Sequence, residues 1–492
     1  MIEQLPILQV LLPLLAAPLC VMARRGRAAA VLATAVCWGA FGVSIALLGR
    51  VLEEGVIVYA LGGWSAPWGI EYRIDVLAAF LALFVSGIGA LVLTYAPRSL
   101  AAEVAESQRN LFYALYLLCL TGLLGITITG DLFNLFVFLE ISSLSSYGLI
   151  SLGRHRRSLT AAFRYLIMGT LGATFILIGI GLMYQMTGTL NMADMVERIV
   201  EGESLRTVLV AFAFLTVGIG LKMALFPLHQ WLPEAYAFAP STVSAFIAAS
   251  STKVSLYILL RFVYTIYGVE FVFDRLELHH ILVPLSLAAM FLASGVAIYQ
   301  TDLKRLLAFS SVAQVGYMTL GASLASVDGL TASIAHLFNH ALTKGGMFLA
   351  VGCLVLRIGR VELRDLRGLG RRMPWTFFAF VIGGLGLIGI PGTAGFVSKW
   401  YLLRATLGGG DWPLAVAVLL SSLLAVIYIW RVIEVAYFQL PESRHSQIAE
   451  APMSLLIPTW ILIGASVYFG VRATYSVDLA QRAAQALIGG GP

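Results

Sequence analysis

Four charged side chains lie inside long apolar stretches of the sequence: Glu140, Lys222, Lys253 and Lys399. A charged group at the centre of a lipid bilayer costs about 2.5–3.5 kcal/mol on insertion scales, so such groups are expected to face a partner or water. One glutamate and one lysine can form a static ion pair that joins two helices. Three lysines and one glutamate cannot all be neutralised in this way, which favours a pathway for protons or ions.

Lysine and glutamate have the chemistry that a proton pathway needs. Removal from water favours the neutral form of either group, whereas a nearby opposite charge favours the charged form. A buried lysine whose carboxylate partner moves can therefore take up and release a proton near neutral pH. Arginine effectively never loses its proton in proteins and could not act in this way.

His336, His340 and Lys344 form a second group, at spacings of four residues. This spacing puts all three on one face of a helix, spread over about 12 Å. Two histidines four residues apart can ligate a metal, but no third ligand is adjacent. The other interpretations are a structurally satisfied histidine pair and a proton relay, which we prefer. His229 follows Pro227 and is either a relay or an interfacial histidine.

Several other chemistries are not expected. Residues 384–389 match the pattern GxGxxG, but they lie in an apolar segment without the strand–helix context of a dinucleotide site. The net charge of +6 is not carried by a basic arm, so we expect no nucleic-acid partner. The cysteines are scattered singly and predict no disulfide, zinc site or iron–sulfur cluster, and we expect no metal and no cofactor: Cys20, Cys37, Cys119 and Cys353.

The composition identifies the elements that must position these groups. Of the 492 residues, 59% are hydrophobic and only 12% are charged, about half the usual charged fraction of a soluble domain. Apolar runs of about twenty residues, each long enough to cross about 30 Å of hydrocarbon, recur from end to end. These features exclude a soluble enzyme and predict an all-α polytopic membrane protein. About fourteen spans are expected, near residues 5–22, 29–49, 75–96, 111–129, 132–152, 161–186, 206–230, 241–267, 279–299, 305–325, 329–357, 374–408, 413–438 and 452–471.

We expect residues 1–492 to form a single integral membrane domain. Residues 59–72 are rich in Gly, Trp and Pro and predict an interfacial hairpin. The seventh span contains Phe226-Pro227, and the twelfth contains Pro391 among glycines, so both helices should be interrupted. Interruptions five spans apart are typical of internally repeated transporter folds with sites near the membrane midplane.

Loop charges predict the orientation of the chain. Cytoplasmic loops carry an excess of Lys and Arg. The more basic set of alternate loops should therefore be cytoplasmic, which puts both termini outside the cell: Arg24, Arg25, Arg27, Arg98, Arg109, Arg154, Arg156, Arg157, Lys304, Arg305, Arg357, Arg360, Arg364, Arg367, Arg371, Arg372 and Arg444. The opposite set is sparser: Arg50, Arg73, Arg198, Arg206, Arg275 and Arg404.

Three stretches together resemble a known family. They are residues 131–140 (DLFNLFVFLE), the segment from Lys222 through LHQWLPEA at residues 228–235 to Lys253, and residues 336–345 (HLFNHALTKG). The chain resembles, over nearly its whole length, the antiporter-like membrane subunits shared by respiratory complex I, membrane-bound hydrogenases and Mrp-type cation/proton antiporters. Within that superfamily it is most similar to the D-type subunits of Mrp Na⁺/H⁺ antiporters, whose twelfth-span lysine matches Lys399.

The resemblance implies two inverted five-helix repeats, at residues 111–267 and 279–438, between N-terminal helices with a hairpin (1–110) and a C-terminal helix (452–492). It also implies that Glu140 pairs with Lys222, that Lys253 and the two span-eleven histidines form a central link, and that Lys399 leads to the exit side. Such subunits bind no cofactor and work packed beside homologous membrane subunits.

Three hypotheses follow from the sequence. The first is a proton-translocating subunit of a multisubunit Na⁺/H⁺ antiporter in the plasma membrane, with H⁺ and Na⁺ as the transported ions. The second is the proton-pumping membrane subunit of a redox-driven complex, a quinone oxidoreductase or a membrane hydrogenase. The third is a scaffold whose buried ion pairs are inert.

Overall fold

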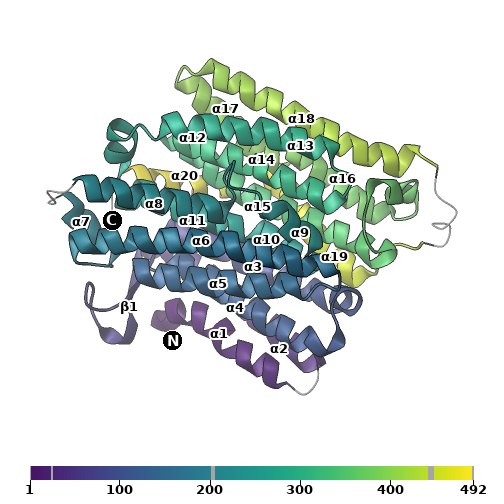
Figure 1. The fold of residues 1–492 in the computed structure, drawn as a ribbon, viewed down its shortest axis with the longest axis horizontal. Coiled ribbons are helices and arrows are strands. Elements are labelled where there is room, and N and C mark those ends of the chain that lie inside the picture. Colours follow the sequence, from purple (N-terminus) through teal and green to yellow (C-terminus); the bar gives the residue numbers. More distant parts are fainter. Residues whose placement is uncertain (1, 24–25, 201–204, 441–447, 490–492) are drawn as a thin grey trace.

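The computed structural model describes residues 2–23, 26–200, 205–440 and 448–489 as a bundle of helices that run along one long axis (Figure 1). Among these residues, twelve helices are long and apolar enough to span a membrane, which confirms an all-α polytopic membrane protein. The first half contains α1 (Leu5–Met22), α2 (Gly26–Glu54), β1 (Ile57–Ala60), β2 (Glu71–Ile74), α3 (Val76–Glu103), α4 (Arg109–Ile128), α5 (Leu132–Ser151), α6 (Arg156–Thr187), α7 (Met192–Val200), α8 (Leu205–Met223), α9 (Leu232–Phe238), α10 (Ser241–Ala249) and α11 (Ser251–Leu260). The second half contains α12 (His279–Ala288), α13 (Ser294–Tyr299), α14 (Leu303–Ser323), α15 (Val327–Ile358), α16 (Pro374–Ile388), α17 (Ala394–Gly408), α18 (Trp412–Phe438), α19 (Met453–Val471) and α20 (Thr474–Ile488).

Both predicted interruptions are present. The seventh span ends as α8 at Met223, and Ala224 adopts a left-handed conformation (φ 59°) before Phe226-Pro227. The twelfth span divides into α16 and α17, and Gly389 takes a φ of 92°, a region that glycine reaches without the steric cost of a Cβ. The eighth span, expected to be continuous, is also interrupted, at Ser250 between α10 and α11.

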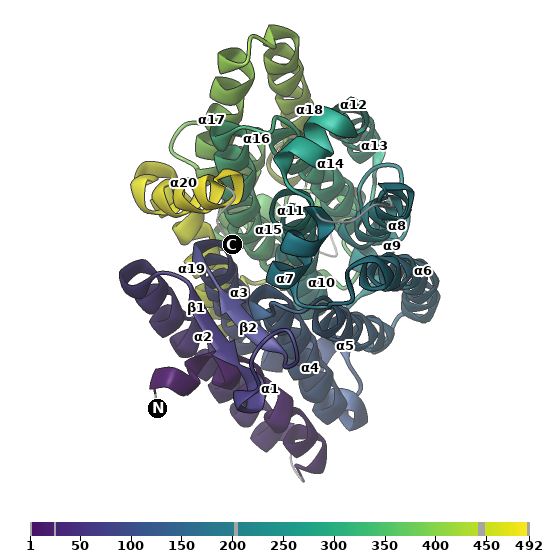
Figure 2. The ribbon, with the colours of Figure 1, turned by 90° about the vertical axis from the view of Figure 1, so that its left-hand side faces the viewer.

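The hairpin expected at residues 59–72 is present as β1 and β2, which pair antiparallel from Ile57 with Ile74 to Ala60 with Glu71. Trp64 and Trp68 at its tip are exposed. A helix outside the expected spans, α20, lies across the same end of the bundle and packs on α3 and α15 (Figure 2). Its mixed polar and apolar sequence lacks the continuous hydrophobicity by which spans are recognised.

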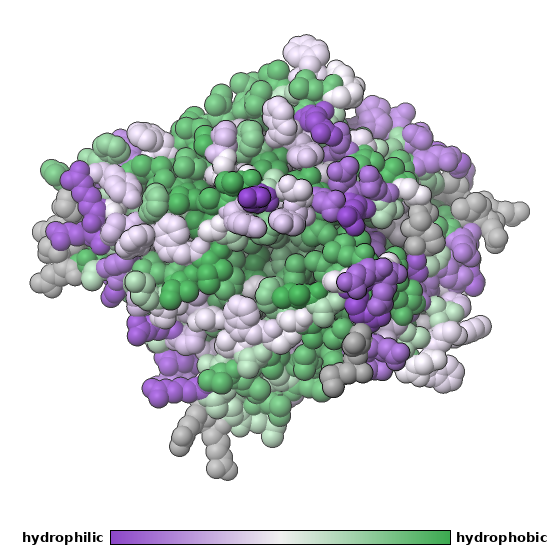
Figure 3. Space-filling view, turned by 180° about the vertical axis from the view of Figure 1, so that it is seen from behind, coloured by the Kyte–Doolittle hydropathy of each residue, from purple (hydrophilic) through white to green (hydrophobic). Residues whose placement is uncertain are grey.

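The opposite end of the bundle collects the basic loops, and we call it the basic-loop end. There Arg154 N donates to Glu103 O (3.3 Å), and Arg360 pairs with Asp302 (3.4 Å). The hairpin and the start of α1 lie at the other end, the hairpin end (Figure 1). Apolar residues cover the middle of the rear face, and hydrophilic ones gather mainly toward its two ends (Figure 3).

Three of the residues behind the predicted orientation lie outside the described residues: Arg24, Arg25 and Arg444. The others divide between the two ends as alternate loops should. Which end faces the cytoplasm stays a prediction from the excess of basic residues.

The helix α15 forms the centre of the bundle, with α3, α10, α14, α16, α17 and α19 packed around it. Close packing at the α16–α17 interruption relies on small residues. A Cβ on Gly395 would clash with the carbonyl oxygen of Gly386, so the two segments touch backbone to backbone. This contact fixes where α17 begins.

Replacing Gly395 with alanine is expected to lower the free energy of unfolding by about 1–3 kcal/mol, because the added methyl forces α16 and α17 apart. The measurement is thermal unfolding of the purified protein in detergent. Gly42→Ala in α2 is the matched control, since its Cβ meets no described atom within 4 Å. Equal stability of the two variants would contradict the close contact.

Candidate functional site

Lys222 and Glu140 form an ion pair between α8 and α5. The Lys222 Nζ lies 3.3 Å from Glu140 Oε1 and donates to Ser143 Oγ at 2.8 Å. The lysine side chain is 4% exposed and the glutamate side chain 24% exposed, so only the carboxylate reaches the surface of the chain. Lys222 is the penultimate residue of α8, where the helix ends. Its ammonium therefore joins α8 to α5 beside the point where α8 ends.

A small polar cavity adjoins this pair. Its volume is about 20 Å³, and a water needs roughly 10–15 Å³ and two or more polar partners. Its hydroxyl-bearing residues come from α5, α6 and α11, and Lys222 of α8 completes the polar lining: Ser142, Ser143, Ser146, Tyr165, Lys222, Ser251 and Ser255. The cavity thus has the size and the polarity to hold a water between Lys222 and the helix that carries Lys253.

Lys253 is 1% exposed and is held by neutral oxygens. Its Nζ donates to Ala248 O at 2.5 Å and to Thr252 Oγ1 at 3.3 Å. Ala248 lies in the last turn of α10, where the carbonyls lack partners within the helix and carry the negative end of the helix dipole. The unexpected interruption at Ser250 therefore supplies the ligand of this lysine.

The two histidines of α15 differ in their contacts. His336 is bonded on both sides, by Ser398 Oγ of α17 at Nδ1 (2.8 Å) and by Gln314 Oε1 of α14 at Nε2 (2.9 Å). The His340 ring is parallel to that of His336, with centroids 6.1 Å apart. Neither His340 nitrogen has a hydrogen-bond partner among the described residues, although the side chain is 2% exposed. Both ring nitrogens of His336 are thus hydrogen-bonded, whereas His340 is buried with neither nitrogen hydrogen-bonded among the described residues.

Lys344 lies on the same face of α15, one turn beyond His340, and contacts α14. Its Nζ donates to Leu307 O at 2.8 Å and to Ser310 Oγ. The side chain is fully buried. The expected helical face is therefore formed, but the lysine at its end is bound by oxygens of a neighbouring helix.

Lys399 lies in α17, and its side chain reaches back to the end of α16. Its Nζ donates to Leu387 O (2.8 Å) and Ile388 O (3.0 Å), the last carbonyls of α16, and to Ser422 Oγ of α18 (3.0 Å). The ammonium also lies 4.5 Å from the centre of the Tyr317 ring. The hydroxyl of Tyr317 contacts Ser421 Oγ at 2.6 Å. Two carbonyls at a helix end, one hydroxyl of α18 and an aromatic face thus take the place of water around this ammonium.

The remaining predicted residue, His229, lies apart from this row. It is partly buried in the turn between α8 and α9, stacked on Phe226 with ring centroids 5.2 Å apart. Its Nδ1 has no hydrogen-bond partner within the described ranges. No group of three His, Cys, Asp or Glu side chains among the described residues could hold a metal ion.

Several polar groups of the site were not singled out from the sequence. Gln314, Tyr317, Ser398 and Ser422 connect His336 and Lys399 across four helices. A search for amides inside apolar spans, extended from the search for charges, would have found Gln314. Serine gave no signal, because a serine inside a helix commonly bonds its own backbone, as Ser422 also does to Val418 O.

Comparisons with known proteins identify one family, and the matching relatives cover nearly the whole chain. Residues 129–425 match the family model described as NADH:quinone oxidoreductase/Mrp antiporter, TM. The chain is 42% identical to the N subunit of the NADH-quinone oxidoreductase of Desulforudis audaxviator, over 94% of each protein. It is 31% identical to the D subunit of the Na(+)/H(+) antiporter of Bacillus subtilis, over 98% of this chain and 97% of the relative. A chain in the structure of the Mrp complex from Dietzia sp. DQ12-45-1b superposes with a TM-score of 0.89 at 26% identity, covering 99% of this chain and 97% of that one.

Asp131 is the helix-start residue of α5, which carries Glu140: its carboxylate accepts from Asn134 N at 2.7 Å. Asp131→Ala should lower the free energy of unfolding by about 1 kcal/mol, because the first turn loses its cap, whereas Asp131→Asn should preserve it. Thermal unfolding in detergent compares the two variants. If alanine and asparagine were equally stable, the cap would not position α5.

Proposed function

Because this chain belongs to the NADH:quinone oxidoreductase/Mrp antiporter family of membrane proteins, we propose that it translocates protons as one subunit of a multisubunit Na⁺/H⁺ antiporter. Homologous membrane subunits would be its partners, in the plasma membrane, with both termini outside the cell. One observation carries the proposal: the Lys222–Glu140 pair borders a polar, water-sized cavity that leads toward the helix of a second buried lysine.

The pathway begins at the Glu140–Lys222 pair. The carboxylate stabilises the charged lysine, so widening their 3.3 Å separation favours release of a proton. The partial exposure of Glu140 allows its position to respond to a neighbouring subunit. Water in the serine-lined cavity then accepts the proton on the side that faces α11.

The second stage passes from Lys253 to Lys399 along α15. His340 offers two unbonded ring nitrogens in the described structure, and His336 is connected to α17 through Ser398, the residue before Lys399. Histidine exchanges protons near neutral pH more readily than any other unperturbed side chain. Two further residues lie beside this route: Lys344, which contacts α14, and His229, in the turn between α8 and α9.

The ligands of the three lysines beyond the first pair weigh against the inert-scaffold hypothesis. Lys253, Lys344 and Lys399 each bond neutral carbonyl or hydroxyl oxygens. Such oxygens accept from a charged ammonium and also from a neutral amine, because both carry N–H donors. Their positions therefore survive the loss of a proton, which a static salt bridge does not.

A second host complex is the alternative: the chain would be the proton-pumping subunit of a redox-driven complex. The 42% identity to a protein named as the N subunit of an NADH-quinone oxidoreductase favours it. The route through this chain would be the same, and redox chemistry would lie in partner proteins. Purification of the intact complex in mild detergent distinguishes the two hosts. Iron–sulfur absorbance in the purified complex would favour the redox-driven one, and its absence together with Na⁺-dependent proton movement in vesicles would favour the antiporter.

Lys222→Arg tests the proton-release step. Arginine keeps the positive charge beside Glu140 but does not release a proton, so proton movement in vesicles containing the intact complex should fall by at least about tenfold. Lys222→Ala should abolish it as well. Arg164→Lys, in an exposed surface pair with Glu234, is the control and should leave the rate unchanged. A normal rate in Lys222→Ala would refute the pathway.

Ser255→Val tests the water in the cavity. The larger apolar side chain should fill the space of about 20 Å³ beside Lys222, exclude the water and slow proton movement by about tenfold or more. Thr174→Val removes a hydroxyl from the outer surface of α6 and is the matched control. Unchanged proton movement in Ser255→Val would mean that protons do not pass through this cavity.

A further inference from the structure

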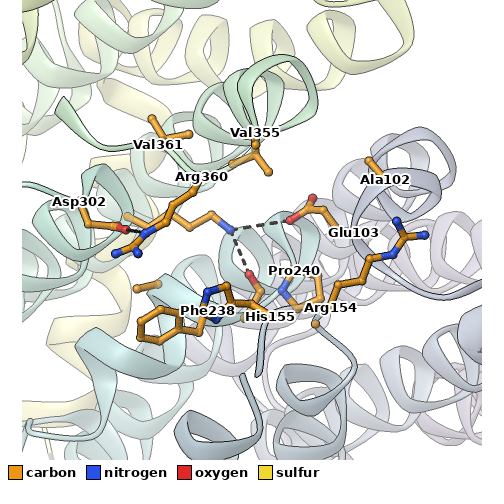
Figure 4. A pocket seen from close by; sticks show the side chains of 15 residues that line it. Ala102, Glu103, Arg154, His155, Phe238, Pro240, Asp302, Val355, Arg360 and Val361 are labelled. Atoms are coloured by element: carbon orange, nitrogen blue, oxygen red, sulfur yellow. Dashed lines mark hydrogen bonds and ion pairs between the residues drawn. The ribbon is translucent and has the colours of Figure 1, made fainter. Parts of the chain in front are cut away.

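A second cavity lies at the basic-loop end, away from the row of buried lysines (Figure 4). Its volume is about 360 Å³, room for several waters. Glu103, at the end of α3, lies on one wall, and the Asp302–Arg360 pair lies on another. The cavity is therefore a charged depression on the end of the bundle, beside the junction of α9 and α10.

A loosely joined ion pair lies at the bottom of this cavity. The Lys304 Nζ is 3.9 Å from Glu103 Oε2, and it donates to Ala239 O at 3.0 Å. The side chains are 8% and 14% exposed, respectively. At this separation the two groups are an ion pair without a hydrogen bond, in contact with the space above them.

The same carboxylate caps α10. Glu103 Oε2 accepts from Ser241 N at 2.8 Å and from Ser241 Oγ at 3.0 Å, at the first residue of the helix. The last turn of α10 provides Ala248 O, which accepts from Lys253. A helix of nine residues, about 13 Å long, thus separates the Glu103–Lys304 pair from Lys253.

The arrangement is repeated at α16. Glu450 accepts from Trp375 N (2.8 Å) and from Thr376 Oγ1 (2.6 Å) at its first turn, and Lys399 bonds the carbonyls of its last turn. Two short helices therefore each hold a carboxylate at the N-terminus and a buried lysine at the C-terminus. Both charges match the helix dipole: the carboxylate lies at its positive end and the lysine at its negative end.

We propose that the Glu103–Lys304 pair is a positioning element whose charge balance controls, through α10, how readily Lys253 holds a proton, and that the cavity above it admits water and ions to the pair. This inference rests on the proposed role of Lys253 in proton movement. At a distance of about 13 Å, the length of α10, the opposite charges of the intact pair nearly cancel at Lys253. Loss of either member leaves a single charge, which at an effective dielectric constant of about 20 changes the proton affinity of Lys253 by about eightfold.

The other groups that face Lys253 stay the same in these variants. His336, His340 and Lys344 of α15 lie within electrostatic range of it. Tyr236 of α9 contacts Ile247 O in the last turn of α10, and Lys222 lies beyond the serine-lined cavity. The charged residues of α3 and α4, which also pack near α10 and α11, lie at the basic-loop ends of those helices: Arg98, Glu103 and Arg109.

The test compares Glu103→Gln, Lys304→Gln and the double variant in the intact complex. Glu103→Gln leaves the Lys304 ammonium unopposed, so the pH profile of proton movement should shift to lower pH by about 0.5–1 unit. Lys304→Gln leaves the carboxylate unopposed and should shift the profile to higher pH by a similar amount. The double variant should return to the profile of the unaltered protein. A purely structural role would shift both single variants in the same direction, or neither, and that result would overturn the proposal.

Two further measurements separate this inference from the proposed function. Thermal unfolding in detergent as a function of pH should show the same opposite displacements, and this readout does not require transport. Ala237→Cys should react with a membrane-impermeant maleimide, because Ala237 lines the cavity. The four native cysteines are buried, so the label should report on this position. A loss of transport in Lys222→Arg with no displacement at Glu103 or Lys304 would reject the inference alone. An unreactive cysteine would reject the access of water.

Discussion

Interruption of a helix is the feature on which the site depends, because it creates the carbonyl ligands of two of its buried ammonium groups. A continuous helix uses its carbonyls internally, whereas the last turn of an interrupted helix leaves them open. Lys253 binds such a carbonyl at the end of α10, and Lys399 binds two at the end of α16. For these two lysines the cost of removing an ammonium from water is thus offset by main-chain dipoles, whereas Lys222 has a side-chain carboxylate beside it.

The rest of the bundle holds these interruptions in fixed positions relative to one another. The long, continuous α15 presents His336 and His340 toward α14 and α17, and the backbone contact between Gly386 and Gly395 fixes the start of α17. In the proposed function, proton exchange along such a row would not depend on whether an ion gradient or a redox reaction supplies the energy. The same row suits an antiporter and a redox-driven complex, which agrees with the names of the relatives on both sides of that division.

The sequence predicted the class of fold, the two proline-linked interruptions and the hairpin, because hydropathy, proline and turn residues act locally. The interruption at Ser250 was not predicted, since no proline or glycine marks it. The contacts of Tyr317 and Ser398 were not predicted either, because they join residues about 60 to 100 positions apart, and only packing decides which serine faces a partner. The short helix α20 lacked the continuous apolar run by which the other helices were recognised.

The unequal distribution of counter-charges limits how many protons the interior can store. Lys222 has a carboxylate neighbour, so a proton there leaves the local charge balanced, whereas a proton on Lys253 or Lys399 adds an uncompensated positive charge. Both of those lysines act electrostatically on His336 and on His340. Like charges in a poorly polarisable interior repel strongly, so double occupancy is penalised. In the proposed pathway, the arrival of a proton at one lysine would therefore favour release of the proton held by the next.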